Sequence, residues 1–162
     1  MKKFLTFILF LSLATSYAQE TTFILIRHAE KTNDGTKDPT LTAEGETRAN
    51  NLLKMFEKAD ITAVYSTNYK RTQLTVAPLA KAKGLEIKNY DWKNPKALLN
   101  KILETNNGET VLICGHSNTT PILANLLTGK DTFTTFEDSD YGNLLIIAAT
   151  KVGAGKLLHM RY

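Results

Sequence analysis

The sequence lacks several features that would complicate or replace a simple hydrophobic core. Its single cysteine, Cys114, excludes an internal disulfide framework. Because Val111, Leu112 and Ile113 precede it, we expect Cys114 to be a buried, unreactive thiol and neither a nucleophile nor a metal ligand. Internal repeats, low-complexity segments and long linkers are also missing. The sequence therefore predicts one domain with a single core.

A hydrophobic run long enough to form a permanent membrane span is missing as well. The longest run covers 4–14, with Lys2 and Lys3 before it and the small residues Ser16 and Ala18 after it. These are the parts of a cleavable signal peptide, whereas a permanent span needs about 20 apolar residues. No cysteine follows the run, so lipid attachment there is excluded. We predict a signal peptide at 1–18 and a periplasmic or secreted protein with no stable membrane anchor; a retained anchor or a buried first helix is the alternative.

The charges show no large excess of either sign. The chain has 20 lysines and arginines against 16 aspartates and glutamates, and without Lys2 and Lys3 the basic count falls to 18. A protein that binds nucleic acid should carry a dominant basic surface. The near balance of charge therefore argues against nucleic acid as a partner.

Residues 19–162 alternate between strand patterns and helix patterns. Strands are predicted at 22–26, 61–65, 85–90 and 110–114, and in a terminal hairpin at 143–150 and 156–162. Helices are predicted from Thr42 to about Phe56 and at 69–83, 95–105 and 121–127, with a loop at 130–140. This order predicts a three-layer α/β/α sandwich with a mostly parallel central sheet and at least one antiparallel strand.

Single residues suggest how several of these helices begin and end. Thr42 is expected to cap the first helix, and the small Gly45 allows that helix to approach the sheet closely. The polar residues at 66–68 and a threonine at 119–120 are the expected caps of the second and fourth helices. Pro78 implies a kink or an early break in the second helix.

Reactive residues follow three of the predicted strands. Arg27 and His28 follow the first strand, Arg71 lies shortly after the second, and His116 follows the strand at 110–114. The carboxyl ends of parallel strands meet at one edge of a sheet, so these side chains should converge. Arginine offers phosphate a fixed fork of donors, and histidine is nucleophilic near neutral pH. The pattern predicts a phosphate site in which His28 attacks the phosphoryl group.

The same residues resemble the motifs of the histidine phosphatase superfamily, which has the phosphoglycerate mutase-like fold. The matching motifs are Arg27-His28-Ala29-Glu30, Leu41-Thr42 with Gly45, Ala49 and Leu52, Ser66 with Arg71-Thr72, and Gly115-His116-Ser117. They occur in the family's order between 23 and about 128. The resemblance implies that His28 becomes a phosphohistidine, and that Arg27, Arg71 and His116 bind the phosphoryl oxygens.

Two positions depart from the family's pattern. Ala29 replaces the usual glycine and is tolerated if the turn has no need of a positive φ. Ser117 stands where some members carry the acidic residue that protonates the leaving oxygen. Asp91, at the end of the predicted strand 85–90, is the predicted general acid, with Glu86 and Glu30 as alternatives. We also expect Lys31 to contact the substrate.

The sequence and the resemblance together predict a metal-independent phosphomonoester hydrolase that needs no cofactor and acts on a small-molecule substrate. No cluster of histidine, cysteine and glutamate has the spacing of metal ligands. A phosphomutase is one alternative, although the segment at 84–95 is short where longer insertions shape the pocket of the mutases. A non-catalytic phosphate-binding domain on the same fold is the other alternative.

Overall fold

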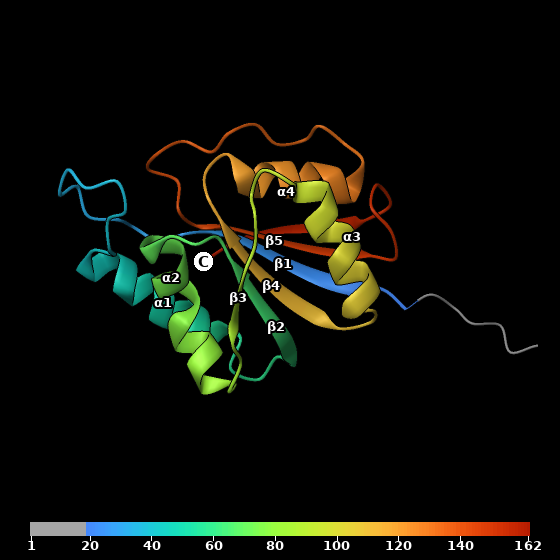
Figure 1. The fold of residues 1–162 in the computed structure, drawn as a ribbon, viewed down its shortest axis with the longest axis horizontal. Helices are drawn as coiled ribbons and strands as arrows, with labels where there is room; N and C mark the ends of the chain where they lie inside the picture. Colours follow the sequence, from blue (N-terminus) through green and yellow to red (C-terminus); the bar gives the residue numbers. More distant parts are fainter. Residues whose placement is uncertain (1–18) are drawn as a thin grey trace, which may run out of the picture.

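The computed structural model describes residues 19–162, so the predicted signal peptide at 1–18 lies outside the described residues and remains a prediction. The elements are β1 (Thr21–Arg27), α1 (Ala43–Met55), β2 (Ile61–Ser66), α2 (Lys70–Ala82), β3 (Ile87–Asn89), α3 (Pro95–Thr105), β4 (Thr110–Gly115), α4 (Thr119–Thr128), β5 (Asn143–Ala149) and β6 (Lys156–Arg161). Their types and order agree with the sequence prediction, and β3 is shorter than predicted (Figure 1). Within the described range, no helix is long and apolar enough to cross a membrane.

The strands of the described chain form one six-stranded sheet in the order β3-β2-β4-β1-β5-β6. The pairs β1–β4, β4–β2 and β2–β3 are parallel, whereas β5 is antiparallel to both β1 and β6. Arg27 at the end of β1 pairs with Gly115 at the end of β4, and Ser66 at the end of β2 pairs with Cys114. The segments that follow β1, β2 and β4 therefore leave the sheet side by side, as predicted.

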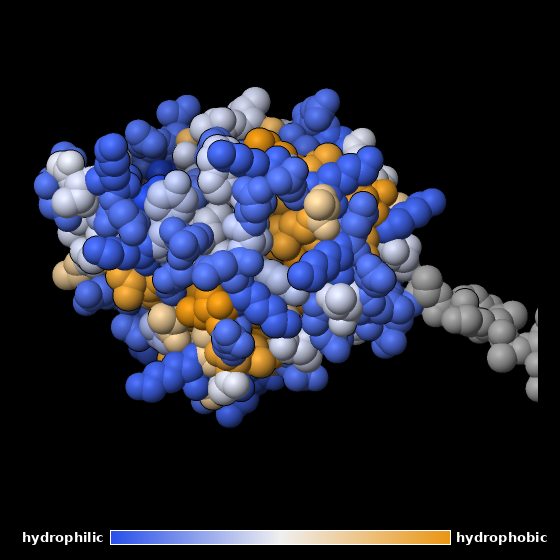
Figure 2. All heavy atoms as spheres, viewed as in Figure 1, coloured by the Kyte–Doolittle hydropathy of each residue, from blue (hydrophilic) through white to orange (hydrophobic). Residues whose placement is uncertain are grey.

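Helices cover both faces of the sheet, which confirms the three-layer arrangement. Alternate residues of a strand point to opposite faces. Phe23 and Leu25 of β1 pack in a core with residues of α3 and α4, whereas Ile24 and Ile26 pack in a second core with residues of α1 and α2. Figure 1 shows these helix pairs on opposite sides of the sheet. Cys114 is buried in the second core as predicted, and the surface in Figure 2 is mainly hydrophilic, with separate apolar patches.

Helix α1 begins as predicted and packs closely against the segment that follows β1. The Thr42 hydroxyl accepts a hydrogen bond of 3.1 Å from the backbone N–H of Gly45, which caps the helix. Gly45 lies against the backbone of Glu30, where an added Cβ would overlap the Glu30 carbonyl oxygen. Glycine is therefore required by the close approach of helix and backbone at this position.

The predicted caps of α2 and α4 are wrong, and α2 has no early break at Pro78, which was one of the two effects predicted for that proline. No N-cap side chain bonds to either helix, and α2 continues through Pro78, because its buried face packs on the sheet. The threonines predicted as caps bond elsewhere. The Thr119 hydroxyl accepts from the backbone N–H of His116 at 2.8 Å, and the Thr120 hydroxyl donates to the carbonyl of Ile26 at 3.1 Å. These hydroxyls connect α4 to the ends of β4 and β1 instead of capping the helix.

Candidate active site

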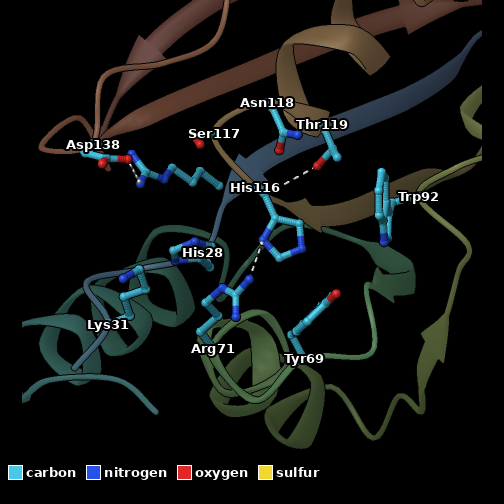
Figure 3. Close-up of a pocket in the computed structure, with 11 residues that line it drawn as sticks. His28, Lys31, Tyr69, Arg71, Trp92, His116, Ser117, Asn118, Thr119 and Asp138 are labelled. Carbon is cyan, nitrogen blue, oxygen red and sulfur yellow. Dashed lines mark hydrogen bonds and ion pairs between the residues drawn. The ribbon is translucent and has the colours of Figure 1, made fainter. Parts of the chain in front are cut away.

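A pocket of about 280 Å³ lies where β1 and β4 end (Figure 3). It brings together the four residues predicted to form the site, namely Arg27, His28, Arg71 and His116. Arg27 is the last residue of β1, His116 directly follows β4, and Arg71 lies in the first turn of α2. Lys31, which was expected to contact the substrate, lines the same pocket.

His28 is held in one orientation and in its neutral form. Its ring Nδ1 lies 2.8 Å from the carbonyl oxygen of Ala29, and a carbonyl only accepts, so Nδ1 carries the proton. Only 3% of its surface is exposed. Burial lowers the pKa of His28 to about 3, and the positive charge of Arg27 acts in the same direction. The ring is therefore neutral at pH 7, with an unprotonated Nε2.

The backbone around His28 is fixed by bonds to two other elements. The His28 N–H donates to the carbonyl of Gly115 at 2.9 Å, and the Ala29 N–H donates to the hydroxyl of Thr75 on α2 at 2.9 Å. Ala29 is buried, and no residue other than glycine has a positive φ within the described chain. Alanine therefore fits the position that is glycine in the family pattern.

His116 lies beside His28, with 5.5 Å between the ring centres. Its Nδ1 is 3.4 Å from Nη2 of Arg71, which can only donate, so Nδ1 accepts and Nε2 donates to the Thr67 hydroxyl at 2.9 Å. Burial lowers the pKa of His116 to about 4, and the charge of Arg71 adds to this effect. His116 is therefore a second neutral imidazole at the pocket.

The two arginines carry positive charge that nearby carboxylates only partly balance. Arg27 is 2% exposed, and its Nη1 donates to the carbonyls of Glu137 and Asp140 at 2.8 and 3.1 Å. The nearest carboxylate oxygens lie 3.7 Å from Arg27, on Asp138, and 3.8 Å from Arg71. The buried Nε atoms of both arginines have no hydrogen-bond partner among the described residues 19–162. A dianion would be favoured here, because the low polarity of the surroundings strengthens its attraction to both guanidinium groups.

The segment between α4 and β5 supplies pocket residues that sequence reasoning missed. Besides the Glu137 and Asp140 carbonyls, it contributes Asp138 to the lining and the Tyr141 ring, which lies 4.2 Å from the Arg27 guanidinium. Its position depends on Phe136, whose N–H donates to the Ser117 carbonyl. Arg27 binds backbone carbonyls in this segment, which every residue type possesses, so the sequence held no signal for these contacts.

The structure does not bring Asp91 to the pocket. Its carboxylate accepts from the N–H of Lys93 at 3.0 Å and from the Asn94 side chain at 2.6 Å, and it lines a different pocket, of about 240 Å³, beside α3. These hydrogen bonds lower the pKa of Asp91. The physical reason is the turn after β3, which uses the carboxylate for its own backbone.

The alternative acids are also placed elsewhere. Glu86 is exposed before β3. Burial is the largest single effect on Glu30 and would raise its pKa, but the hydrogen bonds from Arg48, the shortest of them 2.6 Å, together with a backbone hydrogen bond and the charges of Arg48 and Arg27, hold that pKa below its usual value. Of the described residues that line the main pocket, Asp138 alone has a carboxylate.

Comparison with known proteins finds similarity to phosphatases. Residues 23–91 match the family model of the histidine phosphatase superfamily (branch 1). Phosphoserine phosphatase 1 of Hydrogenobacter thermophilus is 35% identical over 74 residues, which are 42% of this chain and 35% of that protein. The match thus spans about a third of the length of this curated relative.

Two solved structures show the same fold at low sequence identity. The protein histidine phosphatase SixA, in complex with tungstate, superposes with a TM-score of 0.71 at 16% identity, covering 86% of this chain and 96% of that one. A mycobacterial glucosyl-3-phosphoglycerate phosphatase gives a TM-score of 0.70 at 11% identity, covering 86% and 97%. The likeness of fold extends beyond the residues that the family model matches.

Proposed function

We propose that this chain is a member of the histidine phosphatase superfamily, whose family model matches residues 23–91, and that it hydrolyses phosphate monoesters through a phosphohistidine at His28. The observation that carries the proposal is the state of His28, whose Nδ1 proton is bound to the Ala29 carbonyl and whose pKa is lowered to about 3. The Nε2 lone pair is therefore available for attack at neutral pH. Arg27 and Arg71 supply positive charge around the same pocket.

The proposed reaction has two displacements at phosphorus. In the first, the bond between Nε2 of His28 and phosphorus forms, the bond from phosphorus to the leaving oxygen breaks, and the leaving oxygen takes up a proton. The ring becomes positively charged, and the Ala29 carbonyl stabilises that charge through Nδ1. In the second, water attacks phosphorus and the N–P bond breaks, which releases inorganic phosphate and restores the neutral ring.

His116 changes its protonation when phosphate binds. Its Nδ1 is an acceptor in this structure and would repel a phosphoryl oxygen. A dianion at the pocket favours the charged form of a neighbouring imidazole and raises its pKa. We therefore assign His116 a role as a proton-accepting phosphate ligand, which binds the anion together with one proton.

The pocket offers little to protonate a leaving oxygen. Asp138 is the one carboxylate among the described lining residues, but it is fully exposed, lies near Arg27 and is on the side of the pocket away from Trp92 (Figure 3). A pocket with no strong proton donor favours substrates whose leaving group is stable without a proton or already carries one. Imidazole satisfies this condition because its pKa lies near neutrality. A phosphohistidine side chain is therefore a second candidate substrate, in line with the name of the SixA structure.

Hydrolysis of an aryl phosphate by the purified protein tests the proposed function. His28→Ala should lower the rate by about a thousandfold or more, because the nucleophile is lost. His159→Ala is the matched control, since His159 lies on β6 and does not line the pocket, and it should retain the rate. Equal rates for the wild type and His28→Ala would refute the covalent mechanism.

Two further measurements separate the alternatives. Quenching with alkaline detergent during turnover, which preserves a P–N bond, should trap a phosphoenzyme in the wild type but not in His28→Ala. If the phosphoryl group is transferred during turnover to an added alcohol faster than to water, the protein is a phosphomutase. If phosphate binds but no substrate is turned over, the protein is a phosphate-binding domain.

A further inference from the structure

Trp92 is a large apolar side chain that remains 40% exposed at the pocket. In the part of the chain that the structure describes, the other large apolar residues with high exposure lie away from this pocket, and they are Met55, Leu74, Ile122, Leu158 and Met160. An indole beside an anion site can bury apolar area against the organic part of a ligand. Its position therefore points to a ligand that extends beyond the phosphate.

Tyr69 provides a second aromatic surface in the same part of the pocket. Its ring lies 5.1 Å from the ring of His116 in an edge-on arrangement, and the Arg71 guanidinium lies 4.5 Å from its centre. In Figure 3, Trp92 and Tyr69 are on the side of His116 away from His28 and Lys31. The two aromatic residues thus occupy the end of the pocket opposite the nucleophile.

The geometry of phosphoryl transfer directs the leaving group toward this end. The attacking and leaving atoms lie roughly in line through phosphorus. With His28 as the attacking residue, the leaving group extends away from His28, and Trp92 and Tyr69 are the aromatic residues that it meets. A planar group fits against such side chains because its flat face can stack on them.

Asp91 accounts for the placement of Trp92. Its carboxylate binds the backbone N–H of Lys93 and the side chain of Asn94, and its carbonyl accepts from the Asn94 N–H at 3.2 Å. These bonds fix the residues that follow Trp92 in a tight turn. Lys93 adds a further contact, with Nζ 5.7 Å from the centre of the Trp92 ring.

We infer that Trp92 and Tyr69 form a subsite that selects phosphorylated compounds with a planar leaving group, and that Asp91 is the positioning residue for Trp92. This inference rests on the proposed function, because it takes His28 as the nucleophile. The ligand class comprises aryl phosphates and phosphorylated imidazoles, and it disfavours phosphate esters of small alcohols.

Binding of two phosphonates to the purified protein tests the subsite without any leaving-group chemistry. Phenylphosphonate and methylphosphonate carry the same anionic group on a P–C bond that a phosphatase does not hydrolyse. Calorimetry should show phenylphosphonate binding about tenfold more tightly, the size expected for stacking on one aromatic side chain. Because Trp92 is the single tryptophan, phenylphosphonate should also change the intrinsic fluorescence more than methylphosphonate does.

Variants of Trp92 and Asp91 test the two residues separately, and a variant of Leu158 is the matched control. Trp92→Ala should bring the two affinities within about twofold while methylphosphonate binding is retained, and Trp92→Phe should restore most of the difference. Leu158→Ala removes an exposed apolar side chain from β6 and should change neither affinity. Asp91→Asn keeps an oxygen acceptor for the Lys93 N–H and should preserve the preference, whereas Asp91→Ala should weaken it.

Each outcome bears on the inference. Equal affinities of the two phosphonates for the wild type would overturn the subsite and leave the proposed function standing. A Trp92→Ala variant that loses both ligands equally would show a structural role for Trp92 and would also overturn the subsite. If the wild type binds neither phosphonate nor inorganic phosphate, the proposed function fails together with the inference.

Discussion

Two neutral imidazoles lie beside two guanidinium groups, and this arrangement defines the chemistry at the residue scale. Burial is the main cause of the low pKa of both His28 and His116, and the arginine charges add to it. The same charges attract a phosphoryl dianion. In the proposed mechanism, one set of positive groups therefore adds to burial in keeping His28 unprotonated and also binds the phosphoryl group that His28 attacks.

Proton NMR of the histidine rings tests these states. Between about pH 5 and pH 8, the ring signals of His28 and His116 should not titrate in the ligand-free protein, because their pKa values are lowered to about 3 and about 4. A titration midpoint near the ordinary histidine value for either ring would contradict the assignment.

The same pKa values predict how stability depends on pH. Unfolded histidines take up protons near their ordinary pKa of about 6.5, whereas the folded rings remain neutral until about 3 and about 4. Below about pH 6.5 the unfolded state thus binds more protons than the folded state does. The free energy of unfolding should therefore fall as the pH is lowered from about 7 to about 5. His28→Gln removes one of the two groups and should show a smaller fall in urea denaturation at pH 7 and pH 5.

At the scale of elements, helix α1 holds the segment that follows His28. Gly45 packs on the backbone of Glu30, the Thr42 N–H donates to the Glu30 carbonyl at 2.9 Å, and Arg48 binds the Glu30 carboxylate. These contacts fix a backbone only two residues from His28. The Arg48–Glu30 pair that rules Glu30 out as an acid therefore has a structural use.

Gly45→Ala tests this packing, because the change should lower the free energy of unfolding, whereas glycine-to-alanine changes in helices usually raise it. In an ordinary helix interior the change to alanine stabilises by roughly 0.5–1 kcal/mol. Here a Cβ would overlap the Glu30 carbonyl oxygen, so the free energy of unfolding should fall by about 1–3 kcal/mol.

Urea denaturation measures the effect, with Glu44→Ala as the matched control. Glu44 is an exposed residue in the same first turn, and its change should alter stability by about 0.5 kcal/mol or less. The rate on an aryl phosphate should fall for Gly45→Ala only. Increased stability of Gly45→Ala would show that helix and backbone are not in close contact.

For the whole molecule, the folded sheet creates an anion site that the unfolded chain lacks. The pocket collects residues from β1, α2, the segment after β4 and the segment before β5, which are far apart in sequence. Only the folded state can present these positive groups together. Folding and anion binding are therefore linked.

Inorganic phosphate should accordingly stabilise the protein against heat. At a phosphate concentration of 100 times Kd, the expected gain is about 2.7 kcal/mol, which raises Tm by several degrees in a chain of this size. Arg71→Met should abolish the shift, whereas Lys70→Met, which changes the exposed neighbouring cation, should retain it. Chloride at matched ionic strength is the salt control, and an equal shift with chloride would contradict specific binding.

The sequence by itself determined the order of elements, the mostly parallel sheet and the meeting of Arg27, His28, Arg71 and His116. These follow from local properties, because apolar periodicity defines strands and helices and parallel strands place their carboxyl ends together. The Thr42 cap was also predictable, since it depends on residues near in sequence, whereas Gly45, which was expected to approach the sheet, packs on the backbone of Glu30 in the segment that follows β1.

Only the tertiary structure decided where the remaining polar groups point. Asp91 bonds to its own turn, Glu30 bonds to Arg48, and Asp138 reaches the pocket from a loop with no recognisable motif. Such directions depend on which partner lies within about 3 Å after packing, and residue type does not specify that partner. The position of His28, the proposed nucleophile, was predictable because a strand end fixes it, whereas the surroundings of the leaving group depend on loops that packing alone brings together.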